Sequence, residues 1–321
     1  MYKKTLVCAL GLCLVLGCAP KESKVFTSTE ADTKFAQVLE NDYGYTPILQ
    51  YAGKTLWAYL PAERDIYKIV GAGIPPTAPK REFTIQFLEG NFESGEFIFE
   101  YDIVPMTKAL KGNGITTQYT PSFNKEYRNV SNTITRSYLS SEAPPEFIIT
   151  VFADTINGVE AKSTMHPKDL ERYYAGGLPP EEYNMRIINE VIGDKEIVGD
   201  KEGKHLKVAE VSWPKFLIDQ ALQRIRFKFQ RSDFPPEETP KSELLKQIAL
   251  TLLIYDFKDY ERVVLRDLRG SSEETFSKAQ IEAMKDTVGL PKENPDSKPR
   301  IVTIDFSDMW KNQQEDSDSS E

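Results

Sequence analysis

About the first 20 residues place the strongest constraint on what this chain can fold into. Lys3 and Lys4 precede an unbroken run of apolar and small residues over positions 6–16. A membrane-spanning helix needs about 20 apolar residues to cross roughly 30 Å of hydrocarbon, so this run is too short to be one. A positive start followed by a short apolar centre is typical of a secretory signal peptide, which we place at residues 1–17. The rest of the chain must then fold as a body outside the hydrocarbon.

The end of the apolar run resembles the lipobox of bacterial lipoproteins. The matching residues are Val15, Leu16, Gly17 and Cys18, although Leu16 is bulkier than the small residue usual at its position. The resemblance implies cleavage between Gly17 and Cys18, diacylglycerol on the Cys18 sulfur and acylation of the new amino group. One acyl chain gives only marginal membrane binding, whereas a second makes anchoring stable. The resemblance therefore implies a folded body held at a membrane by its lipid.

The same resemblance implies a place in the cell, the bacterial cell envelope. In proteobacteria, aspartate directly after the lipidated cysteine favours retention in the inner membrane, and this chain has Ala19 there. In a Gram-negative host we therefore expect the outer membrane rather than the inner membrane.

Cysteine and histidine usage limits the chemistry of the body. The three cysteines are Cys8, Cys13 and Cys18, and all belong to the predicted signal peptide or its cleavage site. We therefore expect no disulfide, no cysteine nucleophile and no Cys-ligated zinc in the body. His166 and His205 show no metal-binding spacing, and we interpret both as exposed, solvated side chains. The sequence predicts no metal site and no cofactor.

The charge balance argues against nucleic acid as a partner. The chain has 40 Lys and Arg against 49 Asp and Glu, a net charge of −9. One stretch, residues 224–231, places basic residues next to Phe227 and Phe229. Nucleic acid binding requires a broader basic surface. We interpret this stretch as the solvated face of a helix or strand.

Hydrophobic patterning predicts an α+β fold of antiparallel hairpins with packed helices. Alternation and turn signals, Asn157-Gly158 above all, place strands in pairs. The hairpins are expected at residues 48–60, 83–103, 147–164 and 250–265. Helical spacing and capping, including a capping box from Ser271 to Glu274, predict helices at residues 124–139, 167–174, 180–191, 214–229 and 271–288. A last strand is expected at residues 301–304.

Composition along the chain suggests five parts. We expect a lipidated tether at residues 18–33, a strand-rich unit at 34–140, an α+β unit at 141–310 and a disordered acidic tail at 311–321, all after the signal peptide. A hairpin followed by a helix recurs within the second unit, with Asp154 and Asp169 in the first copy and Asp256 and Asp267 in the second. Duplication and generic hairpin-helix order both explain this recurrence.

Motifs for enzymes with local signatures are missing from the sequence. It contains no Gly-x-Ser-x-Gly and no phosphate-binding loop. Aromatic residues of the N-terminal strands are expected in the core, and Tyr43 and Tyr45 on the surface. We expect a non-catalytic binding or scaffolding protein whose partner is an envelope protein or a glycan. The alternatives are a lipid-anchored hydrolase with acidic catalytic residues, marked by carboxylates in one cleft, and a carrier of an apolar ligand, marked by a deep dry cavity.

Overall fold

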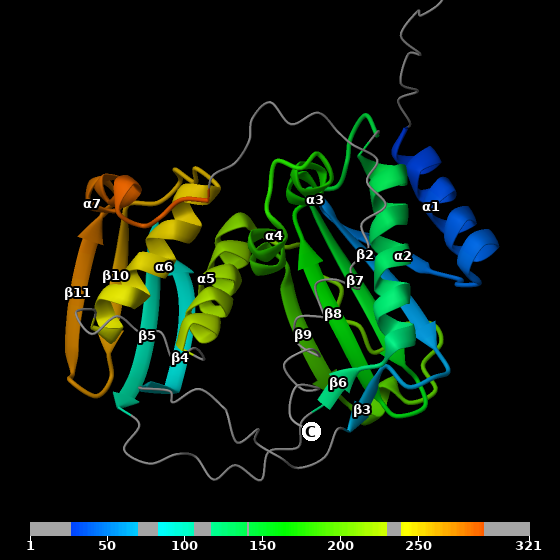
Figure 1. The fold of residues 1–321 in the computed structure, drawn as a ribbon, viewed down its shortest axis with the longest axis horizontal. Coiled ribbons are helices and arrows are strands. Elements are labelled where there is room, and N and C mark those ends of the chain that lie inside the picture. Colours follow the sequence, from blue (N-terminus) through cyan, green and yellow to red (C-terminus); the bar gives the residue numbers. More distant parts are fainter. Residues whose placement is uncertain (1–26, 70–82, 106–116, 140, 230–238, 292–321) are drawn as a thin grey trace, which may run out of the picture.

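The computed structural model describes residues 27–69, 83–105, 117–139, 141–229 and 239–291. Within these residues, helices and strands form two mixed sheets, each covered by helices (Figure 1), so the α+β prediction is confirmed. A short pair, β3 (Tyr67–Ile69) and β6 (Thr117–Tyr119), accompanies the first sheet. Residues 15–18 of the lipobox and the expected strand at 301–304 lie outside the described residues.

The first sheet has five strands in the order β1-β2-β7-β8-β9. They are β1 (Ile48–Ala52), β2 (Thr55–Ala62), β7 (Phe147–Asp154), β8 (Val159–Met165) and β9 (Ile188–Gly193). β2 and β7 run parallel at the centre, and every other neighbouring pair is antiparallel. The predicted hairpins β1–β2 and β7–β8 are confirmed. The second one turns at Gly158, whose φ of 68° is a conformation that glycine adopts without steric cost.

Four helices share one core with a face of this sheet: α1 (Ser28–Tyr43), α2 (Pro121–Tyr138), α3 (Pro167–Tyr174) and α4 (Pro180–Arg186). Thr27 caps α1 in a capping box with Glu30, and the helix buries Ala31, Phe35 and Leu39. The predicted tether at 18–33 therefore overlaps a helix from Ser28 onward. The first turn of α1 is mostly polar, and Phe35 and Leu39, two of its three buried residues, follow position 33. The residues before that position therefore showed no helical periodicity.

The opposite face of the first sheet is covered by the chain between β9 and α5. Trp57, Tyr59 and Val151 on this face pack with Ile197, which belongs to a short 3-10 helix, η1 (Lys195–Ile197). Further along the same segment, Leu206 contributes to this cluster. The first sheet is thus buried on both faces, which explains the nearly continuous apolar character of β2 and β7.

The second sheet has four strands in the order β11-β10-β5-β4. They are β4 (Phe83–Glu93), β5 (Glu96–Pro105), β10 (Arg262–Asp267) and β11 (Ser272–Ser277). The expected hairpin β4–β5 is confirmed, and β5 runs parallel to β10. Helices α5 (Trp213–Phe229) and α6 (Pro240–Ile254) pack on one face, together with α7 (Lys278–Ala283) and η2 (Met284–Asp286).

Each sheet combines segments from both sides of residue 140. The β4–β5 hairpin, within the range expected for the strand-rich unit, pairs with β10 near the end of the described chain. In the other direction, β2 pairs with β7. The sheets therefore do not follow the expected division into residues 34–140 and 141–310. We use first unit and second unit below for the five-stranded and four-stranded sheets with their helices.

Three local predictions are wrong. Residues 250–254 belong to helix α6 and not to a strand, so β10 pairs with β11 instead of forming a hairpin with them. A short apolar run fits a buried helix as well as a strand, and Thr239 and Pro240 begin this one as a helix. The helix beginning at Pro180 ends at Arg186, and Val191 lies on β9 with 55% of its surface exposed.

The third wrong prediction is the capping box at Ser271 and Glu274. Residues 272–277 form β11, and the capping box is made by Ser277 with Gln280 at the start of α7. Pairing with β10 outweighs the local capping signal. No helix in the described parts of the chain combines the length and apolar character needed to cross a membrane.

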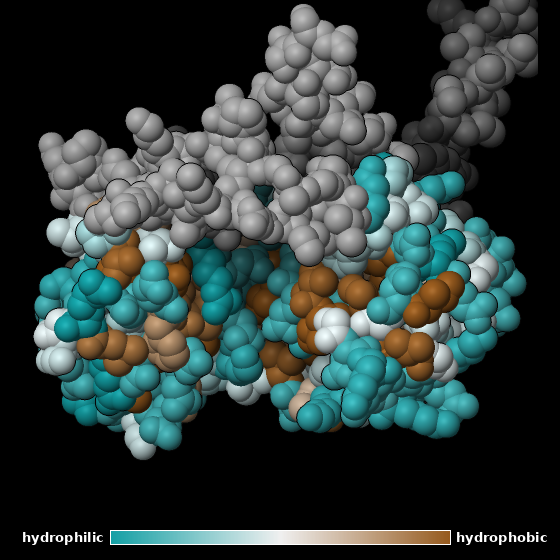
Figure 2. Space-filling model, turned by 90° about the horizontal axis from the view of Figure 1, so that it is seen from below, coloured by the Kyte–Doolittle hydropathy of each residue, from teal (hydrophilic) through white to brown (hydrophobic). Residues whose placement is uncertain are grey.

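Exposed apolar side chains are spread in small groups. Figure 2 views the molecule from the lower end of Figure 1, where brown side chains of both units form separate patches among teal ones. On the first unit, four exposed residues belong to β9 or to the turns near it: Ile156, Val191, Ile192 and Val198. Small groups of this kind are ordinary on a protein surface.

Candidate functional site

A pocket of about 250 Å³ lies between β9 and α5, and we call it the α5–β9 pocket. Helix α5 packs on β4 of the second unit and also contacts β9 of the first, so the pocket lies where the two units meet. Its lining residues are Ile188, Asn189 and Glu190 from β9, and Asp219, Leu222, Gln223, Arg226 and Phe227 from α5.

Two carboxylates contribute to this pocket, and each has a lysine partner. Glu190 forms an ion pair with Lys162 of β8, and Lys215 Nζ lies 2.5 Å from Asp219 Oδ1. Burial raises the pKa of the Asp219 carboxyl, and the charge of Glu190 acts in the same direction, while Lys215 opposes both. The pocket therefore combines an ionisable pair with cations that offset its charge.

Gln223 fixes the relative position of α5 and β9. Its Oε1 accepts a hydrogen bond from the Asn189 backbone N–H at 3.1 Å, and its Nε2 donates to the Ile187 carbonyl at 2.6 Å. Arg226 donates to the Leu88 carbonyl of β4 at 3.4 Å. Phe227 adds an aromatic ring that is 43% exposed. The pocket thus offers amide, carboxylate and guanidinium groups together with an accessible aromatic ring.

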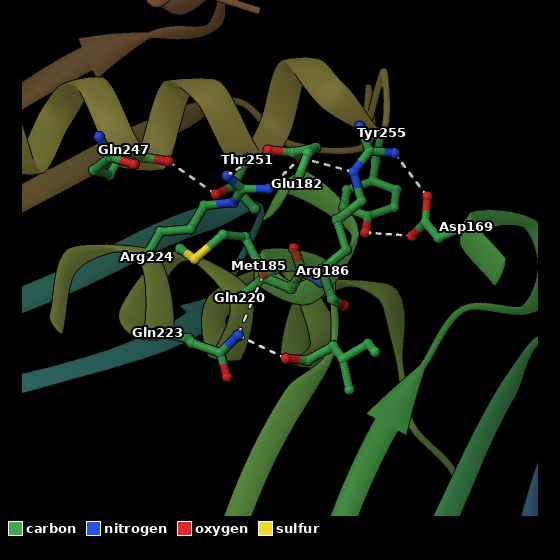
Figure 3. A network of polar contacts seen from close by, with 11 residues as sticks. Asp169, Glu182, Met185, Arg186, Gln220, Gln223, Arg224, Gln247, Thr251 and Tyr255 are labelled. Carbon is green, nitrogen blue, oxygen red and sulfur yellow. Dashed lines mark hydrogen bonds and ion pairs between the residues drawn. The ribbon is translucent and has the colours of Figure 1, made fainter. Parts of the chain in front are cut away.

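A buried network of charged side chains lies beside Gln223, which also lines the pocket (Figure 3). The Arg186 side chain is fully buried, and it donates from Nη1 to Asp169 Oδ1 at 2.7 Å and from Nε to Glu182 Oε1 at 2.8 Å. Arg224 donates to both oxygens of Glu182, at 2.5 and 3.2 Å. The Tyr255 hydroxyl donates to Asp169 Oδ2 at 2.6 Å. These contacts join α3 and α4 of the first unit to α5 and the end of α6 in the second.

This network is neutral as a whole, and its groups bind one another. Burial alone would lower the pKa of Arg186, but Asp169 and Glu182 outweigh it and raise that pKa. Burial, reinforced by Asp169, also raises the pKa of the Tyr255 hydroxyl well above its usual value. We expect this network to specify how the two units fit together, since fixing register is the best attested use of buried polar groups. The expectation that Arg224 lies on a solvated face is wrong, because it is 3% exposed.

A second ionisable cluster lies on the other face of the first sheet. His205 Nε2 is 2.9 Å from Glu160 Oε2, and its Nδ1 is 2.6 Å from Asp200 Oδ2. A protonated imidazole donates from both ring nitrogens, and this geometry lets His205 donate to both carboxylates at once. Burial alone would lower the pKa of His205, but the two carboxylates outweigh it and raise that pKa.

Asp200 and Tyr59 complete this cluster. Burial alone would raise the pKa of Asp200, but hydrogen bonds from the backbone and ring of His205 and from the Glu202 backbone lower it to about 2. The Tyr59 hydroxyl donates to the Asp200 carbonyl at 2.5 Å. The cluster fastens the segment after η1 to strands β2 and β8.

Neither histidine is solvated, contrary to expectation. The Nδ1 atom of His166 is 2.8 Å from the Glu146 carbonyl, its ring packs between Phe147 and Trp213, and burial lowers its pKa. Tyr45, expected on the surface, is buried beneath Arg64. A lone polar residue in sequence carries no signal of the partners that folding brings to it.

Most of the N-terminal aromatic residues do lie in the core, as expected, with Trp57, Tyr59, Phe97, Phe99 and Tyr101 all buried. Within the described ranges, no group of three or more His, Cys, Asp or Glu side chains is placed to hold a metal ion. The predicted lipidation residues Val15, Leu16, Gly17 and Cys18 lie outside those ranges.

Sequence reasoning missed the α5–β9 pocket. Residues 224–231, which supply Arg226 and Phe227 to the pocket, are distinctive in sequence for their charge, but no pattern in them indicates that β9 is their neighbour. Comparison of the chain with family models, with curated proteins and with solved structures found no match.

Proposed function

We propose that this chain is a lipid-anchored protein of the bacterial cell envelope that binds a glycan, without catalysis, in the α5–β9 pocket. The anchor is the lipid on Cys18 that the residues before it imply. The folded body, from Thr27 onward, then presents the pocket to other envelope components.

The observation that carries the glycan assignment is the mixture of groups around Phe227. Sugar hydroxyls both donate and accept, and the pocket supplies carboxylate and amide acceptors beside amide and guanidinium donors. An exposed aromatic ring can pack against the apolar face of a sugar ring. The volume, about 250 Å³, lies just below the usual range for small-molecule pockets, which favours one sugar ring over a larger ligand. Five polar residues among eight speak against an apolar cargo.

The binding test uses the full chain in detergent with N-acetylglucosamine oligomers and soluble cell-wall glycan fragments as probes. Phe227→Ala should weaken binding at least tenfold, because the ring supplies the main apolar contact. The matched control is Leu268→Ala, which removes a similarly exposed side chain, 47% against 43%, from the second unit's β10–β11 turn. Equal affinity in both variants, or no binding by the unaltered chain, contradicts the glycan proposal.

A second candidate is a lipid-anchored glycoside hydrolase, and one observation favours it. Glycoside hydrolysis uses one carboxylic acid with a raised pKa and a second carboxylate that stays ionised. Asp219 has the raised pKa and Glu190 is the neighbouring charge. The lysine partners of both residues favour binding instead. Release of reducing sugar by the full chain, abolished in Asp219→Asn, would replace the first proposal with this one.

Anchoring is tested separately from binding. Cells expressing the chain should incorporate radioactive palmitate into it, and Cys18→Ser should abolish the label and leave an uncleaved or soluble product. Globomycin, which blocks the lipoprotein signal peptidase, should cause the precursor to accumulate. An unaltered chain that takes up no label refutes the anchor but leaves the pocket proposal standing.

A further inference from the structure

The two units share one plan (Figure 1). In each sheet the first two strands form a hairpin closed by a two-residue turn, with Ala52 paired to Thr55 in one and Glu93 to Glu96 in the other. The second strand of each hairpin then runs parallel to the first strand of a later hairpin, β2 to β7 and β5 to β10. The order β1-β2-β7-β8 thus corresponds to β4-β5-β10-β11.

The correspondence extends to the turn of the second hairpin. Asp154 pairs with Val159 and its Oδ1 accepts from the backbone N–H groups two and three residues later, at 3.1 and 2.9 Å. Asp267 pairs with Ser272 and its Oδ1 accepts from the same two relative positions, at 3.0 and 2.9 Å.

The residue before each return strand is left-handed, Gly158 with φ 68° and Ser271 with φ 47°. Asp267 therefore occupies the position of Asp154. The recurrence seen in the sequence placed Asp256 at the position of Asp154, but Asp256 follows helix α6 and is not in a hairpin.

The two units differ at one edge. In the first, β9 pairs antiparallel with β8. In the second, β11 is the last strand of its sheet among the described residues. An edge strand presents unpaired backbone donors and acceptors that readily accept another strand.

We propose that residues 301–306 of the same chain, Ile-Val-Thr-Ile-Asp-Phe, occupy this edge as a fifth strand antiparallel to β11. The step in residue number from Asp154 to Asp267 equals the step from Ile188, where β9 begins, to Ile301. By the same step in residue number, Lys162 corresponds to Thr275 and its partner Glu190 corresponds to Thr303. The position of the segment in the chain is thus the one that the shared plan requires.

The chemistry of the segment fits this edge. Successive side chains of a strand alternate between faces, so Val302, Ile304 and Phe306 share one face. By the same register Val302 lies opposite Phe276, which packs against the core beneath the helices. Thr303 opposite Thr275 is a favourable cross-strand pair. The chain from the last described residue to Ile301 spans up to about 33 Å when extended, longer than a six-residue strand.

Disulfide trapping tests the proposal in the full chain, held in detergent, with its three native cysteines replaced by serine. Thr275→Cys combined with Thr303→Cys places two thiols opposite each other, within the range that a disulfide tolerates. The matched control combines Thr275→Cys with Val302→Cys, since a shift of one residue turns the side chain to the other face. We expect at least tenfold more intrachain disulfide in the first pair than in the control.

Equal yields in the two pairs overturn the proposal. Disulfides between chains overturn it as well, because the edge would then hold a second copy. A measurement without cysteines is independent of these variants. Backbone amides of residues 301–306 should exchange with deuterium at least tenfold more slowly than those of residues 312–321, and Thr303→Pro should abolish that protection. Equal exchange in the two segments of the unaltered chain overturns the proposal.

Discussion

Replacing Glu182 by glutamine should cost far more stability than any surface substitution on the same helix. Glu182 lies between two buried guanidinium groups, those of Arg186 and Arg224, which are 1% and 3% exposed. Glutamine keeps the shape and one acceptor oxygen, but it removes the charge. Its amide nitrogen also faces an arginine N–H, so a donor meets a donor.

The magnitude follows from breaking a buried pair on one side only. Removing one partner typically costs 3–5 kcal/mol, because the other charge stays buried and uncompensated. Asp169 still contacts Arg186, at 2.7 Å, so we expect the lower end, about 3 kcal/mol. At about 2–4 °C per kcal/mol, that is a fall of about 6–12 °C in the melting midpoint.

The assay is urea and thermal unfolding followed by circular dichroism, with Glu181→Gln as the control. Glu181 is exposed in the first turn of the same helix, so its substitution should change stability by no more than about 0.5 kcal/mol. The difference between the two variants should persist in 1 M salt, since buried pairs are screened much less than exposed ones. Equal losses in the two variants refute the view that this network locks the units together.

Three further outcomes are expected. The folded-state pKa of His205 lies above its unfolded value. The stability that this histidine contributes to the fold is therefore present below about pH 6.5 and is lost as pH rises through the folded-state pKa. The urea midpoint of the unaltered chain should fall from pH 5.5 to 9, and that of His205→Gln should stay flatter. Gly158→Ala should lower the free energy of unfolding in urea by more than about 2 kcal/mol, because the added Cβ would lie 2.7 Å from the Asp194 carbonyl oxygen. Gly199→Ala is the control, with a similar φ but open space around it, and should lower it by only about 1–2 kcal/mol. A chain beginning at residue 34 should melt well below one beginning at residue 27, because it loses Asp32, which accepts a hydrogen bond from the buried Tyr138 hydroxyl at 2.6 Å; equal midpoints would contradict that role.

Sequence reasoning succeeded where a local rule is sufficient. Asn157-Gly158 specified a hairpin turn because the chain there needs a positive φ. Helical spacing identified α5, and alternation identified β4 and β5. Each of these signals is contained within about a dozen residues.

Sequence reasoning failed where the decision depends on what packs against a segment. The apolar run ending in α6 suits a helix or a strand, and only its burial against the second sheet selects the helix. Residues 188–191 lie where a helix was expected, but pairing with β8 makes them part of the strand β9. The candidate pocket was missed for the same reason, since its two sides come from elements that only the fold brings together.

The sequence by itself determined that residues 27–291, which contain no cysteine, fold without disulfides, and it determined the class of fold and most of the hairpin turns. The tertiary structure alone decided which hairpins share a sheet, which charges meet in the interior and where a pocket opens. The physical reason is that periodicity along a chain reports which face of an element is apolar, but it does not report the partner that covers that face. Partners are selected by the burial and pairing of whole elements, and those energies arise only when distant segments are in contact.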